Sequence, residues 1–224
     1  MQKISVVMPC YNGEKYIRES IDSVLSQTHP VHELIVVNDG STDATLAILE
    51  SYNGIVVINQ ANLGIAPALN TGIKRATGNY IAFNDADDNW MPQKLEWQLA
   101  EMQKNLELEA VFGWMENYIS PELSEAEKAS ILCSTTPLKG FLKGCMLAKR
   151  EVFERYGYFD EGYRTGDFVE WFSRAKDLGI AYGFVEEVIF KRRLHTTNLS
   201  SSPKLGSDFA TILKRRLEAK RKGL

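Results

Sequence analysis

Cysteine and long apolar runs are both scarce in this chain of 224 residues. Only three thiols occur, Cys10, Cys133 and Cys145, and none forms a C-x-x-C pair. An odd number of widely spaced thiols excludes a disulfide scaffold and a zinc ribbon, and it fits a reducing compartment. No stretch approaches the roughly 20 apolar residues of a membrane span, and the run over residues 4–8 is too short for a signal peptide. We therefore expect a cytoplasmic protein.

Three common motifs of α/β enzymes are also absent. The chain has no G-x-x-x-x-G-K-[ST] loop, no G-x-G-x-x-G after its first apolar run and no G-x-S-x-G elbow. These absences argue against a P-loop NTPase, a dinucleotide oxidoreductase and an α/β-hydrolase. The 44% of hydrophobic residues excludes a mainly disordered chain. A net charge of −3 argues against a nucleic-acid partner.

Charge is distributed unevenly along the chain. Residues 214–224 contain six basic residues and one acid, whereas the rest contains 20 basic and 28 acidic residues. Residues 209–224 are predicted to form a basic amphipathic helix, with Phe209, Ile212, Leu213 and Leu217 on one face. Two interpretations stay open for it. The helix packs on the domain with a solvated basic end, or it makes peripheral contact with anionic lipid at the inner face of the membrane.

The first half of the chain alternates strand and helix patterns. Short apolar runs at 4–8, 34–37, 55–58 and 80–83 predict strands, and the first of them is β-branched and ended by Pro9. Helices are expected from Asn12 to before His29, after a cap at Ser41 or Thr42, and over 67–76. Strands separated by helices imply right-handed crossovers and a mostly parallel, Rossmann-like central sheet of the α/β class, flanked by helices.

The second half is less regular. Helices are predicted over 92–104 and 167–178, and a polar helical insertion over 121–132. Strands are predicted over 110–119, 141–147 and, as an edge strand, over 188–194. We expect one domain over residues 1–208.

An acidic cluster follows the fourth predicted strand, where the carboxyl edge of a parallel sheet binds ligands. Asp85, Asp87 and Asp88 form a D-x-D-D sequence. Carboxylates this close repel one another unless a cation lies among them, and oxygen ligands favour Mg²⁺ or Mn²⁺. The alternative is an acidic turn that caps the next helix. An EF-hand is rejected because Trp90 stands where the loop needs glycine.

Several segments, taken in order, resemble glycosyltransferase family 2. They are Ile4–Asn12 (ISVVMPCYN), Glu33–Thr45 (ELIVVNDGSTDAT), Asn62-Leu63-Gly64 and Ala76–Asp88 (ATGNYIAFNDADD). Later segments are similar as well: Phe141–Asp160, Thr165–Phe168 and the Arg-x-His of residues 193–195. The resemblance implies the GT-A fold of that inverting family. Residues 1–104 would bind the nucleotide sugar, and residues 105–208 would bind the acceptor.

The resemblance also implies roles for individual residues. The donor nucleotide, expected to be UDP, would be bound by Pro9, Tyr11, Asn12, Asp39, Asn62, Gly64, Asp85 and Ala86. Asp85 and Asp87 would hold Mg²⁺ or Mn²⁺ on the diphosphate, with His195 as a further ligand. Asp167 would be the general base, with Glu170 as runner-up one turn away.

Simpler readings compete with these roles. Asp39 can serve only its turn, His195 can be a hydrogen-bonded structural residue, and Tyr11 can be a partly buried aromatic. Trp90, beside the acidic cluster, is a candidate platform for a sugar ring.

Three positions depart from the family's pattern. Asn38 replaces an aspartate and Gly166 a glutamate. Leu69 stands where many members have arginine, so either one phosphate contact is missing or it is supplied by Lys74, Arg75 or Arg192.

The expected activity is transfer of a sugar from a nucleotide sugar to a glycan, lipid-linked or small-molecule acceptor. A non-catalytic nucleotide-sugar-binding protein of the same fold is the alternative. A sugar-nucleotide pyrophosphorylase is disfavoured because the loop after the first strand has no basic residue before Lys15.

Overall fold

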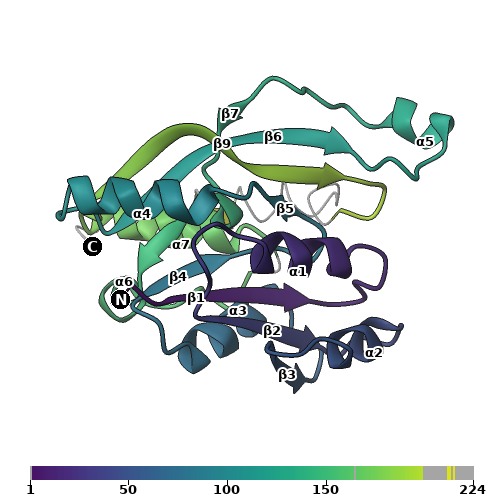
Figure 1. Cartoon of the computed structure of the whole chain (residues 1–224), viewed down its shortest axis with the longest axis horizontal. Coiled ribbons are helices and arrows are strands. Elements are labelled where there is room, and N and C mark those ends of the chain that lie inside the picture. Colours follow the sequence, from purple (N-terminus) through teal and green to yellow (C-terminus); the bar gives the residue numbers. More distant parts are fainter. Residues whose placement is uncertain (1, 164, 199–210, 213, 215–224) are drawn as a thin grey trace.

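A single nine-stranded sheet runs through the whole computed structural model, which describes residues 2–163, 165–198, 211, 212 and 214. Its order is β3-β2-β1-β4-β8-β6-β9-β5, and β7 pairs with β6 (Figure 1). The strands are β1 (Ile4–Cys10), β2 (Glu33–Asp39), β3 (Val56–Gln60), β4 (Tyr80–Phe83), β5 (Asn89–Trp90), β6 (Ala110–Ile119), β7 (Leu138–Lys139), β8 (Leu147–Lys149) and β9 (Tyr182–Leu194). The helices are α1 (Ile17–Leu25), α2 (Thr45–Glu50), α3 (Ile65–Arg75), α4 (Lys94–Lys104), α5 (Glu125–Ser130), α6 (Val152–Arg155) and α7 (Asp167–Asp177), with a 3₁₀ turn η1 at Lys143–Cys145.

The predicted parallel arrangement holds for the first half of the chain. β1 pairs in parallel with both β2 and β4, and β2 pairs in parallel with β3. Every residue of β1 is buried, as expected for a strand covered on both faces. β1 continues to Cys10, past the predicted end, because it stays paired with β2 there. Pro9 is tolerated because β4 leaves β1 after Val7, so the missing N–H costs no hydrogen bond to β4.

The sheet becomes mixed in the second half. β8 is antiparallel to β4 and β6, while β9 is parallel to β6. In Figure 1 the arrowheads of β1, β2 and β6 point to the same side, so the carboxyl edge collects the loops of both halves. The helix predicted over 92–104 is α4, with Leu95, Leu99 and Met102 buried as expected.

Four local predictions were wrong. Residues 141–147 form η1 and the start of β8 rather than one strand, and Gly144 in η1 lies so close to Phe190 that a Cβ there would be 2.4 Å from the ring. β9 begins six residues early and lies between β6 and β5 rather than at the edge. Neither Ser41 nor Thr42 caps α2, because Ala44 lies at its N-cap position; Asp43 Oδ1, one residue earlier, accepts from the N–H of Thr45 at 2.9 Å.

The fourth is Trp90, which is buried in the core instead of offering a face to a sugar. Its short strand β5 pairs with β9, and Lys94 Nζ lies 4.4 Å from its ring centroid.

The predicted basic helix over 209–224 falls almost wholly outside the described residues. Thr211, Ile212 and Lys214 are helical, and Ile212 is buried. A Cβ on Gly166 would lie 2.8 Å from Ile212 Cδ1, so this residue packs at the start of α7. Among the described residues no helix is long and apolar enough to cross a membrane.

Lys94 on α4 gives the fold a pH-dependent stability. It is fully buried, and its Nζ donates to Gln98 Oε1 at 2.7 Å. Burial lowers its pKa to about 7, against about 10.4 in the unfolded chain. The unfolded chain therefore binds the proton more tightly, so this contribution to the free energy of unfolding rises with pH from about 7 toward 10.

We expect wild type to gain about 1.4 kcal/mol more than Lys94→Met does between pH 6 and pH 8. Urea unfolding at both pH values measures the difference, which does not depend on the pH-independent cost of changing the side chain. Lys104→Met, at an exposed position of the same helix, is the matched control and should follow wild type. An equal pH response of wild type and Lys94→Met would contradict the prediction.

Candidate active site

The loops after β1 and β2 are tied together at the carboxyl edge. The N–H of Asn12 donates to Ser41 Oγ at 2.9 Å, and Asn12 Oδ1 accepts from the N–H of Thr42 at 2.8 Å. Asn12 adopts a left-handed φ of 50°, a conformation that asparagine tolerates better than most residues. Tyr11 beside it is half-exposed and lies free for a flat ligand to stack on.

Asp39 joins the loop after β2 to the loop after β3. Its Oδ1 accepts from Gln60 Nε2 at 2.7 Å and from the N–H of Leu63 at 3.0 Å, and its Oδ2 accepts from the N–H of Gly64 at 2.8 Å. The structure thus brings Asp39, Asn62 and Gly64 together as predicted, and it gives the buried carboxylate a clear structural task.

Asn38 is also structural at its buried position. Its Nδ2 donates to Asn59 Oδ1 at 2.9 Å, and its Oδ1 accepts from the N–H of Ser41 at 3.2 Å. A neutral amide suits these two contacts, since it acts as donor and acceptor at once.

The three carboxylates after β4 have three different partners. Asp85 Oδ2 lies 3.1 Å from Lys143 Nζ, and Asp87 Oδ2 lies 3.0 Å from His195 Nε2. Asp88 Oδ1 accepts from the N–H of Arg193 at 2.8 Å. Burial, followed by the charges of Asp87 and Asp85, raises the pKa of Asp88 well above its ordinary value. The loop is therefore more than an acidic turn, because it draws residues from the far end of the sequence to its carboxylates.

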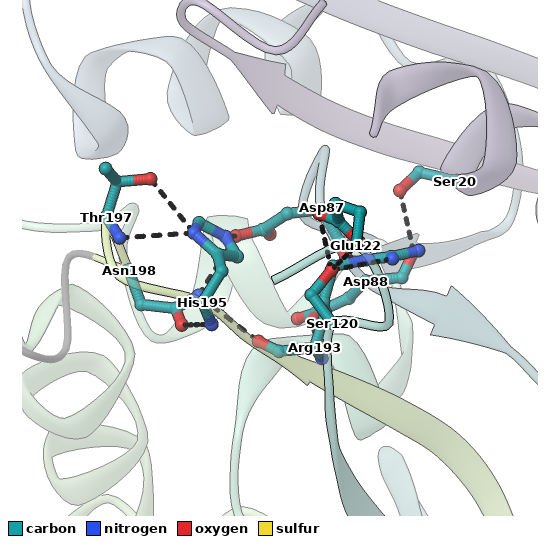
Figure 2. A network of polar contacts seen from close by, with 9 residues as sticks. All are labelled: Ser20, Asp87, Asp88, Ser120, Glu122, Arg193, His195, Thr197 and Asn198. Carbon is teal, nitrogen blue, oxygen red and sulfur yellow. Dashed lines mark hydrogen bonds and ion pairs between the residues drawn. The ribbon is translucent and has the colours of Figure 1, made fainter. Parts of the chain in front are cut away.

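His195 is placed by a polar network around Asp87 (Figure 2). Its Nδ1 lies 2.9 Å from Thr197 Oγ1, and its ring centroid lies 4.8 Å from that of Tyr16. Asn198 Nδ2 reaches the same Asp87 oxygen at 3.3 Å. His195 thus lies beside Asp87 as a metal role would require, and it is also a hydrogen-bonded buried residue as the simpler reading held.

Arg193 holds the backbone of the acidic loop in place. Its Nε donates to the carbonyl of Asp87 at 3.0 Å, and its guanidinium also pairs with Glu19. The guanidinium carbon lies 4.6 Å and 5.0 Å from the ring centroids of Tyr16 and Tyr118. A cation held between two rings and a carboxylate gives the loop a rigid support.

The two base candidates have very different surroundings. Glu170 binds Arg174 through both oxygens, at 2.9 Å to Nε and 3.0 Å to Nη2. Asp167 begins α7, is buried, and its Oδ2 has no hydrogen-bond partner among the described residues. A buried carboxylate oxygen without a partner is costly and calls for an explanation by function.

Lys143 is the functional candidate that the sequence reasoning missed. It lies in η1 under the acidic loop, and the charges of Asp85 and Asp167 overcome the effect of burial and raise its pKa. No motif marks it, because a lysine before Gly-Cys reads as an ordinary loop residue. Only the return of η1 to β4 and β6 brings it to the site.

Three basic residues were candidates for the phosphate contact that an arginine at position 69 would make. Only one of them lies near the carboxyl edge of the sheet. Lys74 and Arg75 lie in the last turn of α3, roughly 14 Å along the helix from its start at the site. Arg192 lies in β9, two residues before its end. Of the three, only Arg192 is placed near the carboxyl edge.

A divalent cation would find suitable donor types here. Asp87 offers oxygen and His195 nitrogen, which suits Mn²⁺, and Mg²⁺ commonly binds one or two carboxylates together with substrate phosphates. In the described part of the chain, however, no three His, Cys, Asp or Glu side chains lie close enough to hold a metal by themselves. The residues therefore fit a cation whose remaining ligands come from a bound diphosphate.

Comparison with known families decides the identity. The model of the family described as glycosyl transferase family 2 matches residues 5–157. The chain belongs to this family. The sequence resemblance is thereby confirmed.

Individual family 2 relatives agree. An uncharacterised glycosyltransferase of Rickettsia prowazekii is 35% identical over 216 residues, which cover 87% of this chain and 66% of that protein. The putative teichuronic acid biosynthesis glycosyltransferase TuaG of Bacillus subtilis is 34% identical, over 89% of this chain and 82% of that protein. The chain spans about two thirds of the length of its first Rickettsia relatives.

Solved structures confirm the GT-A fold. Staphylococcus aureus TarS (residues 1–349) in complex with UDP matches 94% of this chain and 63% of its own, with a TM-score of 0.70 and 21% identity. The same protein in complex with UDP-GlcNAc matches with a TM-score of 0.72, at 20% identity, over 94% of this chain and 65% of its own. At this identity the likeness concerns the fold alone.

Proposed function

We propose that this family 2 chain transfers a sugar from a UDP-linked donor to an acceptor hydroxyl by a single displacement that inverts the anomeric centre. The observation that carries the proposal is Asp167, a buried carboxylate whose Oδ2 has no hydrogen-bond partner among the described residues. It begins a helix, where a negative charge is favoured. An acceptor hydroxyl would satisfy the free oxygen and be deprotonated by it.

The nucleotide is assigned to the loops after β1, β2 and β3. Tyr11 offers its exposed ring to the base, and Pro9 and Asn12 shape the wall of the pocket. Asp39 accepts three hydrogen bonds within the protein, and an ionised carboxylate can accept about four. It can therefore accept one more from uracil while holding the loop of Asn62 and Gly64 in place. The choice of UDP is supported by the TarS complexes with UDP and UDP-GlcNAc, which share this fold.

The donor diphosphate is assigned to the loop after β4. Asp85 and Ala86 would contact the donor, and Asp87 with His195 would hold Mg²⁺ or Mn²⁺ together with the diphosphate oxygens. When bound, the cation neutralises charge that grows on the departing nucleoside diphosphate. Arg193 keeps this loop in place through the carbonyl of Asp87.

The chain's own residues account for the remaining chemistry. Asp167 takes the proton of the acceptor hydroxyl, and the acceptor oxygen forms a bond to the anomeric carbon. The bond from that carbon to the phosphate oxygen breaks, and UDP leaves with the electron pair. Glu170 is not assigned the proton, because both of its oxygens are bound to Arg174.

The acceptor is a glycan, a lipid-linked sugar or a small molecule of unassigned structure. A role in polysaccharide synthesis is supported by the similarity to TuaG, a putative teichuronic acid biosynthesis glycosyltransferase. A cytoplasmic location, with the basic tail against anionic lipid, stays a prediction whose residues lie largely outside the described part of the chain.

Donor turnover tests the proposal against the non-catalytic alternative. Wild type is incubated with UDP-sugars, Mn²⁺ and bacterial cell-envelope extract as acceptor, and release of UDP is followed over time. We expect extract-dependent UDP release with at least one UDP-sugar. Saturable binding of a UDP-sugar without turnover would favour a nucleotide-sugar-binding protein instead.

A further inference from the structure

Lys143 is a buried cation beneath the acidic loop, and the proposed transfer reaction gives it no task. Its side chain is 11% exposed, and its Nζ lies 3.1 Å from Asp85 Oδ2. Burying a lysine side chain costs conformational entropy, and burying its ammonium group costs hydration free energy. Lys143 therefore carries a free-energy cost that surface lysines avoid. Its pairing with Asp85 offsets that cost only while both partners stay in place.

The backbone that carries Lys143 cannot readily move away. Gly144 lies so close to Phe190 that a Cβ there would be 2.4 Å from the ring. The carbonyl of Cys145 accepts from Gln98 Nε2 at 2.8 Å, and Cys145 itself is fully buried. Lys143 is therefore a fixed charge of the site and not a mobile surface group.

Asp85 and Asp87 each have one carboxylate oxygen that already contacts another side chain of the protein. Asp85 is paired with Lys143, and Asp87 Oδ2 is contacted by His195 and Asn198. Within the described residues no three ligand-type side chains are close enough to hold a metal. An ammonium beside Asp85 also repels a divalent cation that approaches the same carboxylate.

We propose that Lys143 is a positioning residue that occupies Asp85 as a built-in counter-charge. The protein without nucleotide then binds a divalent cation weakly, and it takes up the cation together with the donor diphosphate. Phosphate oxygens of the donor then complete the coordination of the cation, because the carboxylates that are paired with protein groups cannot do so. Mg²⁺ commonly binds substrate phosphates in this way. The inference rests on the proposed function only for the identity of the diphosphate.

Calorimetric titration with MnCl₂ alone tests the role of the charge. An opposite charge within about 4–6 Å shifts the pKa of a carboxylate by about 1–3 units, which is a 10- to 1,000-fold change in its affinity for a proton. The affinity for Mn²⁺ should change in the same direction, and we expect Lys143→Met to bind Mn²⁺ about 10- to 100-fold more tightly than wild type. Lys143→Arg keeps the charge and should stay as weak as wild type. Lys139→Met removes an exposed lysine four residues earlier and should also match wild type.

Two results would overturn the inference. One is Mn²⁺ affinity in Lys143→Met no higher than in wild type. The other needs no variant: wild type that binds UDP and yet binds Mn²⁺ as tightly without UDP as with it. If Lys143→Met does not fold, as circular dichroism would show, this second measurement and Lys143→Gln decide the question.

The same titrations separate this inference from the proposed function. Wild type that binds no UDP even with Mn²⁺ would refute the function. The comparison of wild type with Lys143→Met in MnCl₂ alone would still show whether the lysine withholds Asp85 from the metal.

Discussion

Replacing Asp167 with asparagine is expected to reduce sugar transfer by about 10²- to 10⁴-fold, the usual contribution of a general base. The Kd for UDP should stay near that of wild type, because only the group that takes the acceptor's proton is changed. Asparagine is close in size and keeps the start of α7 filled. Initial rates of UDP release and calorimetric titration with UDP and Mn²⁺ measure the two quantities on the same preparations.

Glu170→Gln is the matched control, since Glu170 lies on the same helix and is tied to Arg174. It should keep activity within a few-fold of wild type while lowering the melting temperature slightly. An active Asp167→Asn together with an inactive Glu170→Gln would show that Glu170 is the base.

The second large effect is expected at Asp87. Asp87→Ala should lower turnover by about 10³-fold, because a bound cation contributes several kcal/mol to stabilising the departing diphosphate. The same change should remove the part of UDP affinity that depends on Mn²⁺, and leave the affinity measured in EDTA. Calorimetry with UDP, with and without Mn²⁺, separates the two parts. A variant that keeps its full Mn²⁺-dependent gain would show that Asp87 holds no metal.

The first half of the fold was predictable because its signals are local. A parallel strand buried on both faces reads as a continuous apolar run, and Tyr80–Phe83 forms a strand with the predicted bounds. Glycine, asparagine and aspartate at the strand ends marked the carboxyl edge, where Asp39, Asn62 and Gly64 do come together.

The second half was less predictable because contacts distant in sequence override local propensity. Residues 141–147 look like a strand, yet they contain the 3₁₀ turn η1, in which Gly144 packs closely against Phe190 of the distant strand β9. β9 could not be placed between β6 and β5 from its own residues, since β5 is only two residues long.

The site shows the same division between local and distant information. The D-x-D sequence is recognisable without the structure, and its place after a strand predicts a site for Mg²⁺ or Mn²⁺. The partners of its carboxylates come from residues 143, 193 and 195, which lie more than fifty residues further along the chain. Lys143 has no motif of its own, so only the folded arrangement reveals that Asp85 has a counter-charge.

The claim that a UDP-linked donor binds across the carboxyl edge is tested most directly by a crystal structure of the protein grown with UDP and MnCl₂. The account predicts uracil beside Tyr11 and Asp39, and the diphosphate with its metal beside Asp87. Nucleotide bound elsewhere on the protein, or a carboxyl edge without nucleotide at a UDP concentration far above its measured Kd, would contradict it.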